Sequence, residues 1–325
     1  MKKLKNSRYL PFIILATLAL TWGSSFILIK KGLVYFSDPE VGALRIAFAF
    51  IVFIPLAIRR RHKIQPKHFL YLAVVGIIGS TAPAFLFAKA ETGIDSSLAG
   101  ILNSLTPLFT FIISFAFFRF RARWFNLLGL ILALSGAVGL IVVSGDGNIT
   151  FNFTYAGFVI IATVCYAINI NVIHYKLKDL DNITIVTYGF TFAGIPTLIY
   201  LLFFTPFFDT MRSSFEAVYG LGYIAILGIA GTSFALMIFY YLIQVSNTVF
   251  ASSVTYLIPI VAVMWGIIDG EIFRISYFLW IGLILFGIYL VNTKRLAFSR
   301  RREAPSVRQE KMKNPEKKDE KISVE

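Results

Sequence analysis

Charged side chains are scarce in this sequence, and their scarcity excludes a globular protein that faces water on every side. Only 15% of its 325 residues are charged, whereas soluble domains carry about 25%. Hydrophobic residues make up 57% of the chain, and the mean hydropathy is +0.75. The composition therefore predicts an integral membrane protein.

Cysteine and histidine are almost absent as well. The single cysteine, Cys165, excludes an intrachain disulfide, and the three histidines are too few and too scattered for a cluster of metal ligands. We therefore expect no metal, no cofactor and no catalytic residue in this chain.

Uncharged or nearly uncharged stretches, each long enough to cross a bilayer, recur along the whole chain. They cover residues 11–29, 41–58, 69–88, 96–118, 124–145, 154–173, 183–208, 217–268 and 275–292. The stretch 217–268 has 52 residues, which is too long for one helix of about 20 residues. Its polar break at Gln244, Ser246 and Asn247 divides it. The sequence thus predicts an all-α membrane protein with ten transmembrane helices.

Lysine and arginine are distributed unequally between the two sides of this predicted bundle. Of the 31 basic residues, 25 fall on one side, five on the other, and Arg45 lies within a span. Basic residues mark cytoplasmic loops, so we expect a cell-membrane protein with both termini in the cytoplasm. The net charge of +14 reflects these topology signals, and nucleic acid is therefore not an expected partner.

The two halves of the chain resemble each other in sequence. Residues 72–107 align without a gap on residues 224–259, at an offset of 152 residues. The identities include Gly76 with Gly228, Gly79 with Gly231, and Pro107 with Pro259. An offset of five spans makes the halves cross the membrane in opposite senses, so the repeat is inverted, as in many transporters.

These boundaries divide the chain into five predicted parts. They are a cytoplasmic N-terminus at 1–8, a five-helix repeat at 9–145, an outer loop at 146–152, a second five-helix repeat at 153–293, and a disordered cytoplasmic tail at 294–325. The tail is rich in Lys, Arg and Glu and poor in apolar residues, a composition typical of disorder.

An ordered set of short segments resembles a known family. The segments are TWGSSF at 21–26, PEVGALR at 39–45, SLAGIL at 97–102, GTSFA at 231–235 and YLIP at 256–259. In this set the chain is similar to the ten-helix, EamA-type members of the drug/metabolite transporter superfamily. Members often have a Gly-Glu pair in both halves, but the position equivalent to Glu271 is Arg119 here. The resemblance implies export of metabolites, often amino acids or related compounds, across a prokaryotic plasma membrane.

Polar and aromatic side chains within the spans are the candidate substrate-binding residues, because such groups need partners or a wet cavity in a bilayer. They are Trp22, Ser25, Asn103, Tyr166, Asn169, Tyr240, Thr255 and Tyr256. A cavity lined by them suits a neutral, zwitterionic or amphipathic ligand. Each residue also has a structural interpretation, as a helix-packing contact or as an interfacial anchor.

Two charged residues and four helix-shaping residues complete the candidate site. Arg45 and Glu271 are candidates for gating or for structural charge pairs, although both could simply reach water at the outer face. Pro107 and Pro259 are expected to break or kink their helices. Gly79 and Gly231 are expected to allow close helix packing.

No carboxylate falls in the middle of any predicted span. Glu40, Glu91, Asp95, Glu216, Asp269 and Glu271 all lie near the predicted outer face. Proton relays in transporters use an intramembrane carboxylate or histidine. The sequence therefore favours facilitated diffusion or exchange over proton antiport through a buried carboxylate.

The function that these observations favour is export of small metabolites by alternating access. An uptake permease of the same fold is the alternative, and an integral membrane enzyme that modifies lipids is an alternative of another class. Such an enzyme needs clustered carboxylates or histidines near the interface, and the sequence has none, so we expect no enzymatic activity. The expected partners are a small-molecule substrate and the lipid bilayer, and the oligomeric state stays open.

Overall fold

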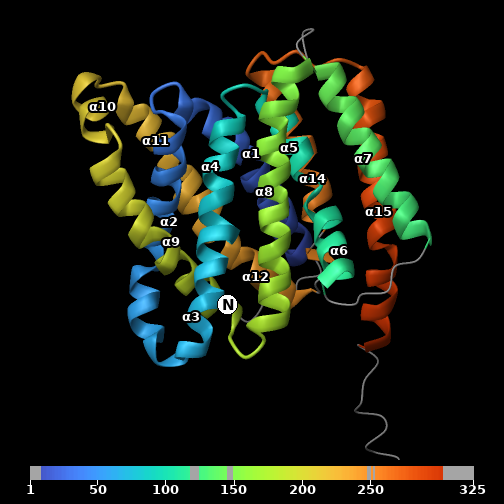
Figure 1. Cartoon of the computed structure of the whole chain (residues 1–325), viewed down its shortest axis with the longest axis horizontal. Coiled ribbons are helices and arrows are strands. Elements are labelled where there is room, and N and C mark those ends of the chain that lie inside the picture. The colour runs from blue at the N-terminus through green and yellow to red at the C-terminus, as the bar shows by residue number, and fades with distance from the viewer. Residues whose placement is uncertain (1–8, 118–123, 145–148, 247–249, 252, 303–325) are drawn as a thin grey trace, which may run out of the picture.

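The computed structural model describes residues 9–117, 124–144, 149–246, 250–251 and 253–302, and every regular element in them is a helix (Figure 1). The helices are α1 (Leu10–Leu33), α2 (Asp38–Arg60), η2 (Arg61–Lys63), α3 (Pro66–Gly76), η3 (Ile77–Thr81), α4 (Ala82–Ala90), α5 (Ser96–Asn103), α6 (Thr106–Phe117), α7 (Trp124–Ser144), α8 (Ile149–Lys176), α9 (Asn182–Phe204), α10 (Phe207–Ser213), α11 (Ala217–Gly228), η4 (Ile229–Phe234), α12 (Ala235–Val245), α14 (Val254–Ile268) and α15 (Ser276–Arg302).

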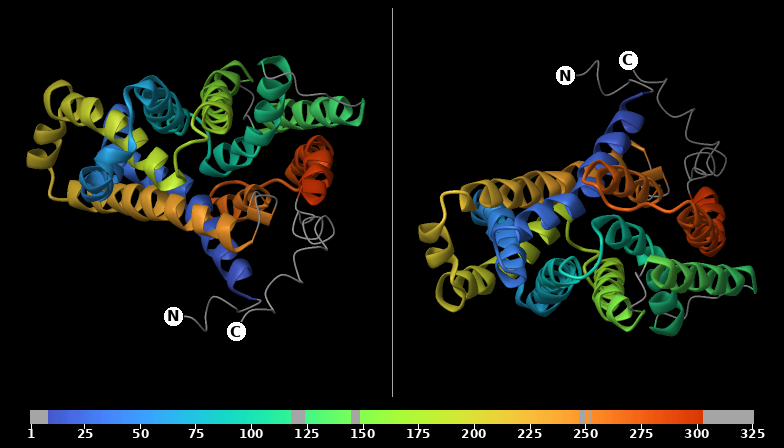
Figure 2. Two further views of the ribbon diagram at one scale, coloured as in Figure 1. Left: turned by 90° about the horizontal axis from the view of Figure 1, so that it is seen from below. Right: turned by 90° about the horizontal axis from the view of Figure 1, so that it is seen from above.

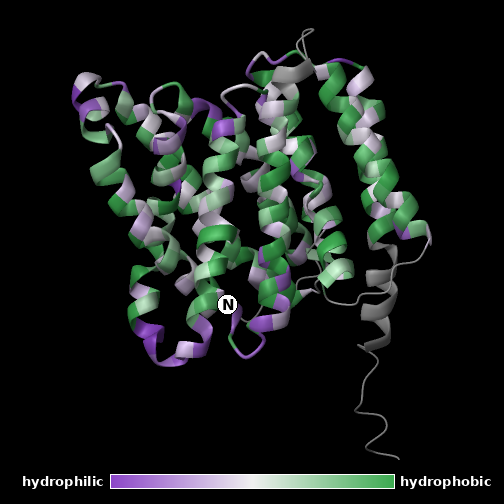
Figure 3. Ribbon diagram, viewed as in Figure 1, coloured by the Kyte–Doolittle hydropathy of each residue, from purple (hydrophilic) through white to green (hydrophobic). Residues whose placement is uncertain are grey.

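Within these described residues, eight helices or continuous helix runs are long and apolar enough to cross a membrane. Two shorter apolar helices, Val254–Ile268 and Ser276–Val291, accompany them. Hydrophilic residues gather at the two ends of the bundle and hydrophobic residues fill the zone between them (Figure 3). This banding is that of a multi-pass membrane protein. We call the two ends the Glu271 end, which contains α10, and the Arg60 end, which contains η2.

Large apolar side chains also cover the outside of the bundle, as a lipid-facing surface requires. Exposed residues of this kind include Phe115, Ile131, Ile199, Phe203 and Phe204. A soluble monomer rarely exposes so much contiguous apolar surface. The outer faces of these helices are therefore suited to contact lipid chains.

Two helix pairs flank the bundle. α7 packs along α15 at one end of the long axis, and α9 packs along α2 toward the other end, where α10 lies (Figures 1 and 2). Gly129 of α7 and Gly287 of α15 meet backbone to backbone, so a Cβ at either position would overlap the other helix. Small residues of this kind permit the close approach of membrane helices.

Two membrane helices contain a turn of π-helix in their middle. η3 joins α3 to α4, and η4 joins α11 to α12. The first residues of the two turns, Ile77 and Ile229, are separated by the 152 residues of the sequence repeat. Such turns are rare and occur frequently at functional sites.

The two candidate prolines lie in different surroundings. The fourth predicted span is divided, because α5 ends at Asn103 and α6 begins at Thr106, one residue before Pro107. Pro107 thus occupies the first turn of a helix, where its missing N–H costs nothing. By contrast, α14 continues through Pro259.

Several predicted boundaries differ from the structure. Residues 149–152 of the predicted outer loop form the first turn of α8, and the predicted seventh span separates into α9 and the short α10. α15 continues to Arg302, so residues 294–302 of the predicted disordered tail are helical. Arginine and lysine are good helix formers and are favourable at a helix C-terminus, which explains the extension. The predicted N-terminus 1–8, loop residues 146–148, Asn247, Arg119 and tail residues 303–325 lie outside the described residues.

Candidate functional site

A tight turn at the end of α14 positions the carboxylate of Glu271. Gly270 has φ +88°, a left-handed conformation that residues with a Cβ adopt at a cost. The Glu271 N–H donates to the Gly266 carbonyl at 2.9 Å, and the Gly270 N–H donates to the Ile267 carbonyl at 3.1 Å. This pair of hydrogen bonds is a Schellman motif, in which glycine ends a helix. The turn directs Glu271 back toward α5.

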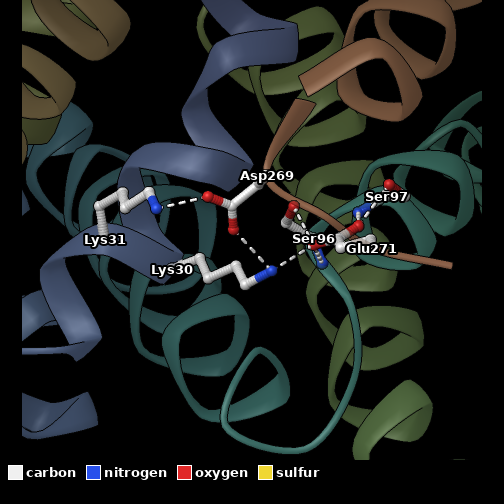
Figure 4. A network of polar contacts seen from close by, with 6 residues as sticks. All are labelled: Lys30, Lys31, Ser96, Ser97, Asp269 and Glu271. Atoms are coloured by element: carbon white, nitrogen blue, oxygen red, sulfur yellow. Dashed lines mark hydrogen bonds and ion pairs between the residues drawn. The ribbon is translucent and has the colours of Figure 1, made fainter. Parts of the chain in front are cut away.

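Glu271 joins three segments that are far apart in the sequence (Figure 4). Lys30 of α1 donates to Oε1 at 2.8 Å. At the start of α5, the backbone N–H groups of Ser96 and Ser97 donate to the same carboxylate at 3.0 and 3.1 Å, and both hydroxyls donate as well. The side chain of Glu271 is only 4% exposed. A negative charge at a helix N-terminus is favourable, so α5 and α1 are tied to the loop after α14.

Asp269 extends the contact to a second lysine. Its carboxylate pairs with Lys30 at 2.9 Å and with Lys31. We call these six residues the Lys30–Glu271 network; they are Lys30, Lys31, Ser96, Ser97, Asp269 and Glu271 (Figure 4).

Both carboxylates of the network are held in their charged form. Burial alone would raise the pKa of Glu271, but the hydrogen bonds from Lys30, Ser97 and Ser96 outweigh it and lower that pKa. Hydrogen bonds from Lys31 and Lys30 lower the pKa of Asp269. The network is therefore ionised at neutral pH.

The network packs tightly against α14. Gly266 of α14 lies so close that an added Cβ would overlap the Ser97 hydroxyl and the Glu271 carboxylate. Above the network lies an open recess of about 250 Å³, lined in part by Lys30, Asp269 and Arg274. Glu271 also lines this recess, so three members of the network border it.

Arg45 points into the bundle. Its Nε donates to the Thr232 hydroxyl of η4 at 3.2 Å, and its guanidinium also interacts with the Tyr166 hydroxyl on α8. Arg45 thus links α2 to the π-helical turn of one half and to α8.

Two candidate aromatic residues are joined through a third ring. Trp22 of α1 packs on Phe239 of α12 with ring centroids 5.2 Å apart, and Phe239 packs on Tyr240 at 5.9 Å. Tyr166 stacks on Phe87 of α4 at 6.1 Å. Trp22, Tyr166 and Tyr240 are all half-buried.

The candidate polar residues lie against the π-helical turns in matching ways. Asn169 of α8 contacts Gly79 of η3, and the hydroxyl of Ser25 on α1 lies within 3.4 Å of a Cβ built on Gly231 of η4. Ser25 also donates to the Thr21 carbonyl at 3.2 Å.

Two candidate amide oxygens have no hydrogen-bond partner among the described residues. They are Oδ1 of Asn103 and Oδ1 of Asn169, and both are buried. A buried polar atom without a partner is costly, so such atoms favour a bound water or ligand. Thr255 and Tyr256 lie half-buried at the start of α14, where Tyr256 packs against the main core.

Sequence reasoning missed most of the polar contacts at both ends. It singled out Glu271 but not Lys30, Asp269 or the two serines, although the Asp-Gly-Glu order at a helix end was a usable signal. At the Arg60 end, Asp181 pairs with Arg60 at 2.7 Å and with Lys63 at 2.9 Å.

A second acidic residue strengthens the Arg60 end. Asp179 pairs with Lys67 at 2.8 Å and lies 2.9 Å from His68. These contacts join the first turn of α3 to the turn between α8 and α9.

The comparison with protein families decides what this helical bundle is. The model of the EamA-like transporter family matches residues 10–142 and again residues 154–293. The chain belongs to the EamA-like transporter family. It is therefore a membrane transporter, and the polar groups inside its bundle are to be interpreted in terms of transport.

Curated relatives agree with this assignment. An uncharacterized transporter of Archaeoglobus fulgidus is 30% identical over 87% of this chain and 99% of its own length. The inner membrane transporter YedA of Escherichia coli is 24% identical, covering 87% of this chain and 91% of YedA. A probable terminal-alkyne amino-acid exporter of Streptantibioticus cattleyicolor is also 24% identical, over 87% of this chain and 93% of its own.

A solved crystal structure has the same fold. It superposes with a TM-score of 0.58 at 17% identity and covers 92% of this chain and 100% of its own. At this identity the likeness concerns the fold alone.

Proposed function

We propose that this EamA-like transporter exports amino acids or related small amphipathic metabolites by alternating access. The observation that carries the proposal is the set of polar and aromatic side chains inside the bundle, with two buried amide oxygens that lack partners among the described residues. Hydrogen-bonding groups and ring faces without a fixed acid suit a zwitterionic or amphipathic ligand. The similarity to an amino-acid exporter supports the same substrate class.

The transporter is built, in this proposal, from ten transmembrane helices in two inverted five-helix repeats, at 9–145 and 153–293. The double match of the family model supports the division. The π-helical turns at an offset of 152 residues support it independently. The packing of the helices also supports this division, because each π-helical turn contacts the first helix of the other repeat: η3 contacts α8, and η4 contacts α1. Inverted repeats provide two related conformations, each open on one side.

In this arrangement both termini are cytoplasmic, and the Glu271 end faces outward. The excess of lysine and arginine on the Arg60 side supports the orientation. The Lys30–Glu271 network then closes the outer side of the transporter. Arg45 and Glu271 act as charges that stabilise particular conformations, and Glu271 does so by tying α1 to α5.

The substrate site, in our proposal, lies between the halves. Trp22, Ser25 and Asn103 come from the first repeat, and Tyr166, Asn169, Tyr240, Thr255 and Tyr256 come from the second. The matching contacts of Ser25 and Asn169 with the two π-helical turns support a site near the centre. Residues from both halves can then contact the same ligand, whether the site is open to the inside or to the outside of the cell.

Mass spectrometry of the growth medium tests export directly. Cells that produce the unaltered protein are compared with cells that produce a Trp22→Ala, Tyr256→Ala double variant and with cells that carry no transporter gene. We expect a few amino acids or related compounds to accumulate outside only with the unaltered protein.

A matched control separates the site from general damage to aromatic residues. Trp124 and Tyr219 are 73% and 61% exposed on the outside of the bundle, so the Trp124→Ala, Tyr219→Ala variant should export normally. Membrane abundance is measured for every variant. Equal media from the unaltered protein and from empty cells would refute export, and depletion of a compound from the medium would indicate uptake instead.

A further inference from the structure

Glu91 is a buried carboxylate that the transport site described above does not use. It follows α4 directly and is only 8% exposed, and neither of its carboxylate oxygens has a hydrogen-bond partner among the described residues. The sequence predicts that Glu91 lies near the outer face, and the structure shows that its side chain is buried. A charged carboxylate is unfavourable in such surroundings, which favour the protonated form.

Charges of both signs surround Glu91. The Lys30 ammonium on α1 and the Arg45 guanidinium on α2 act on it from two sides, and the like charge of Glu271 acts from the loop after α14. The Lys30 peptide N–H also favours the anion, but it lies outside hydrogen-bonding geometry. Burial first, and the Glu271 charge second, raise the pKa of Glu91 well above its ordinary value.

The remaining helix packed on α4 adds no group that titrates near neutral pH. α8 presents Tyr166, which stacks on Phe87, and Tyr155, which lies against Gly93. Unlike Glu271, Glu91 has no hydrogen-bond donor for its carboxylate among the described residues.

Glu40 provides an internal comparison. It is also buried, at 2% exposure, and lies at the same end of the bundle. Its Oε2 accepts hydrogen bonds from the Ser37 N–H at 2.9 Å and the Ser37 hydroxyl at 2.7 Å, and Thr210 lies 3.4 Å from Oε1. The carboxylate of Glu40, which caps α2, thus has hydrogen-bond donors, whereas the carboxylate of Glu91 has none among the described residues.

We propose that Glu91 is a proton-binding site of the transport cycle, occupied while the Glu271 end is closed and emptied when that end opens. The inference rests on the proposed alternating access. It replaces the expectation that no buried carboxylate takes part.

Lys30 connects the proton to the closure. In the closed form Lys30 pairs with Glu271 and Asp269, and a neutral Glu91 does not compete for it. When Glu91 loses its proton, its negative charge attracts Lys30 and repels Glu271. Both effects weaken the Lys30–Glu271 network. Conversely, a proton taken up from the outer side restores the pairing and favours closure.

Infrared difference spectroscopy tests proton binding without a substrate. The purified full-length protein is titrated upward in pH, and the carbonyl band of protonated carboxyl groups is followed. We expect a loss of this band that Glu91→Gln abolishes and Glu40→Gln retains. A band that persists in Glu91→Gln would assign the proton to another residue and overturn the proposal.

Thiol accessibility tests the link to closure. Leu98→Cys, at a residue that is 5% exposed just after Ser97, is introduced into a Cys165→Ser background, and its thiol is labelled from outside with an impermeant maleimide. Ser213→Cys, at an exposed residue, corrects for the pH dependence of the thiol itself.

The corrected labelling should rise with pH, because the closed form binds the proton more tightly than the open form. One proton gives at most about a tenfold rise per pH unit between the two pKa values. Glu91→Gln should stay at the low-pH level throughout, and Glu40→Gln should behave as the parent. The same pH dependence in Glu91→Gln would refute the link. A positive infrared result with failed export would refute the proposed function while leaving the proton site standing.

Discussion

Glu271→Gln should open the Glu271 end of the transporter while leaving the fold intact. The substitution keeps the size of the side chain but removes its negative charge. The Glu271 side chain is 4% exposed, and its carboxylate accepts hydrogen bonds from Lys30 and from the start of α5. The amide nitrogen of glutamine would also face N–H and O–H donors instead of accepting from them.

The magnitude follows from the contacts that are lost. A hydrogen bond to a charged group contributes about 1.5–3 kcal/mol. Lys30 keeps its pair with Asp269 at 2.9 Å, so we expect a loss of this size rather than the about 3–5 kcal/mol of an isolated buried pair. About 1.4 kcal/mol corresponds to a factor of ten, so the ratio of closed to open molecules should fall about 10- to 150-fold.

The assay is the outside labelling of Leu98→Cys in the Cys165→Ser background. Its rate should rise by the same factor in Glu271→Gln, up to the rate of a fully exposed thiol. Glu216→Gln is the control, because Glu216 is exposed at the same end and caps no helix through its side chain. Unchanged labelling in Glu271→Gln would refute the role of the network in closure.

Three further predictions concern other parts of the chain. Gly270→Ala should destabilise the turn by about 1–2 kcal/mol, because its φ of +88° is unfavourable for alanine; Gly222→Ala, in helix α11 with open space around it, should be neutral or stabilising, and thermal unfolding in detergent compares the two. Partial burial raises the pKa of Asp181, but hydrogen bonds from Lys63 and Thr184 outweigh this effect and lower that pKa below its usual range. Its stabilising contribution is therefore present above about pH 4 and lost as pH falls through the lowered value, so Asp181→Asn should lower the unfolding temperature at neutral pH and make it less sensitive to acid; an unchanged acid profile would contradict this. Asn169→Leu should leave the unfolding temperature nearly unchanged, since it removes a buried oxygen without a partner among the described residues, yet abolish export; normal export by this variant would exclude Asn169 from the substrate site.

The membrane helices could be predicted from sequence because long apolar stretches require a bilayer, whatever their neighbours are. Helix α7, for example, could be predicted from its own apolar sequence, without knowledge of the helices against which it packs. The break before Pro107 and the glycine turn at Gly270 also have local signals.

The pairing of side chains could not be predicted in the same way. Lys30 and Glu271 are 241 residues apart and meet only through the packing of α1, α5 and the turn after α14. Glu91 was predicted only to lie near the outer face, since its burial depends on how several helices pack around the end of α4. Residues 294–302 were expected to be disordered by composition, but they extend an existing helix and need no nucleation of their own.

Counterflow in proteoliposomes tests the central claim most directly. Purified full-length protein is reconstituted into vesicles loaded with the compound found in the medium, and isotope-labelled compound is added outside. We predict transient accumulation of label with the unaltered protein and with the Trp124→Ala, Tyr219→Ala variant, and none with the Trp22→Ala, Tyr256→Ala variant or protein-free vesicles. Label that enters no faster than in protein-free vesicles would contradict the assignment of this compound as a substrate and of these side chains as its site.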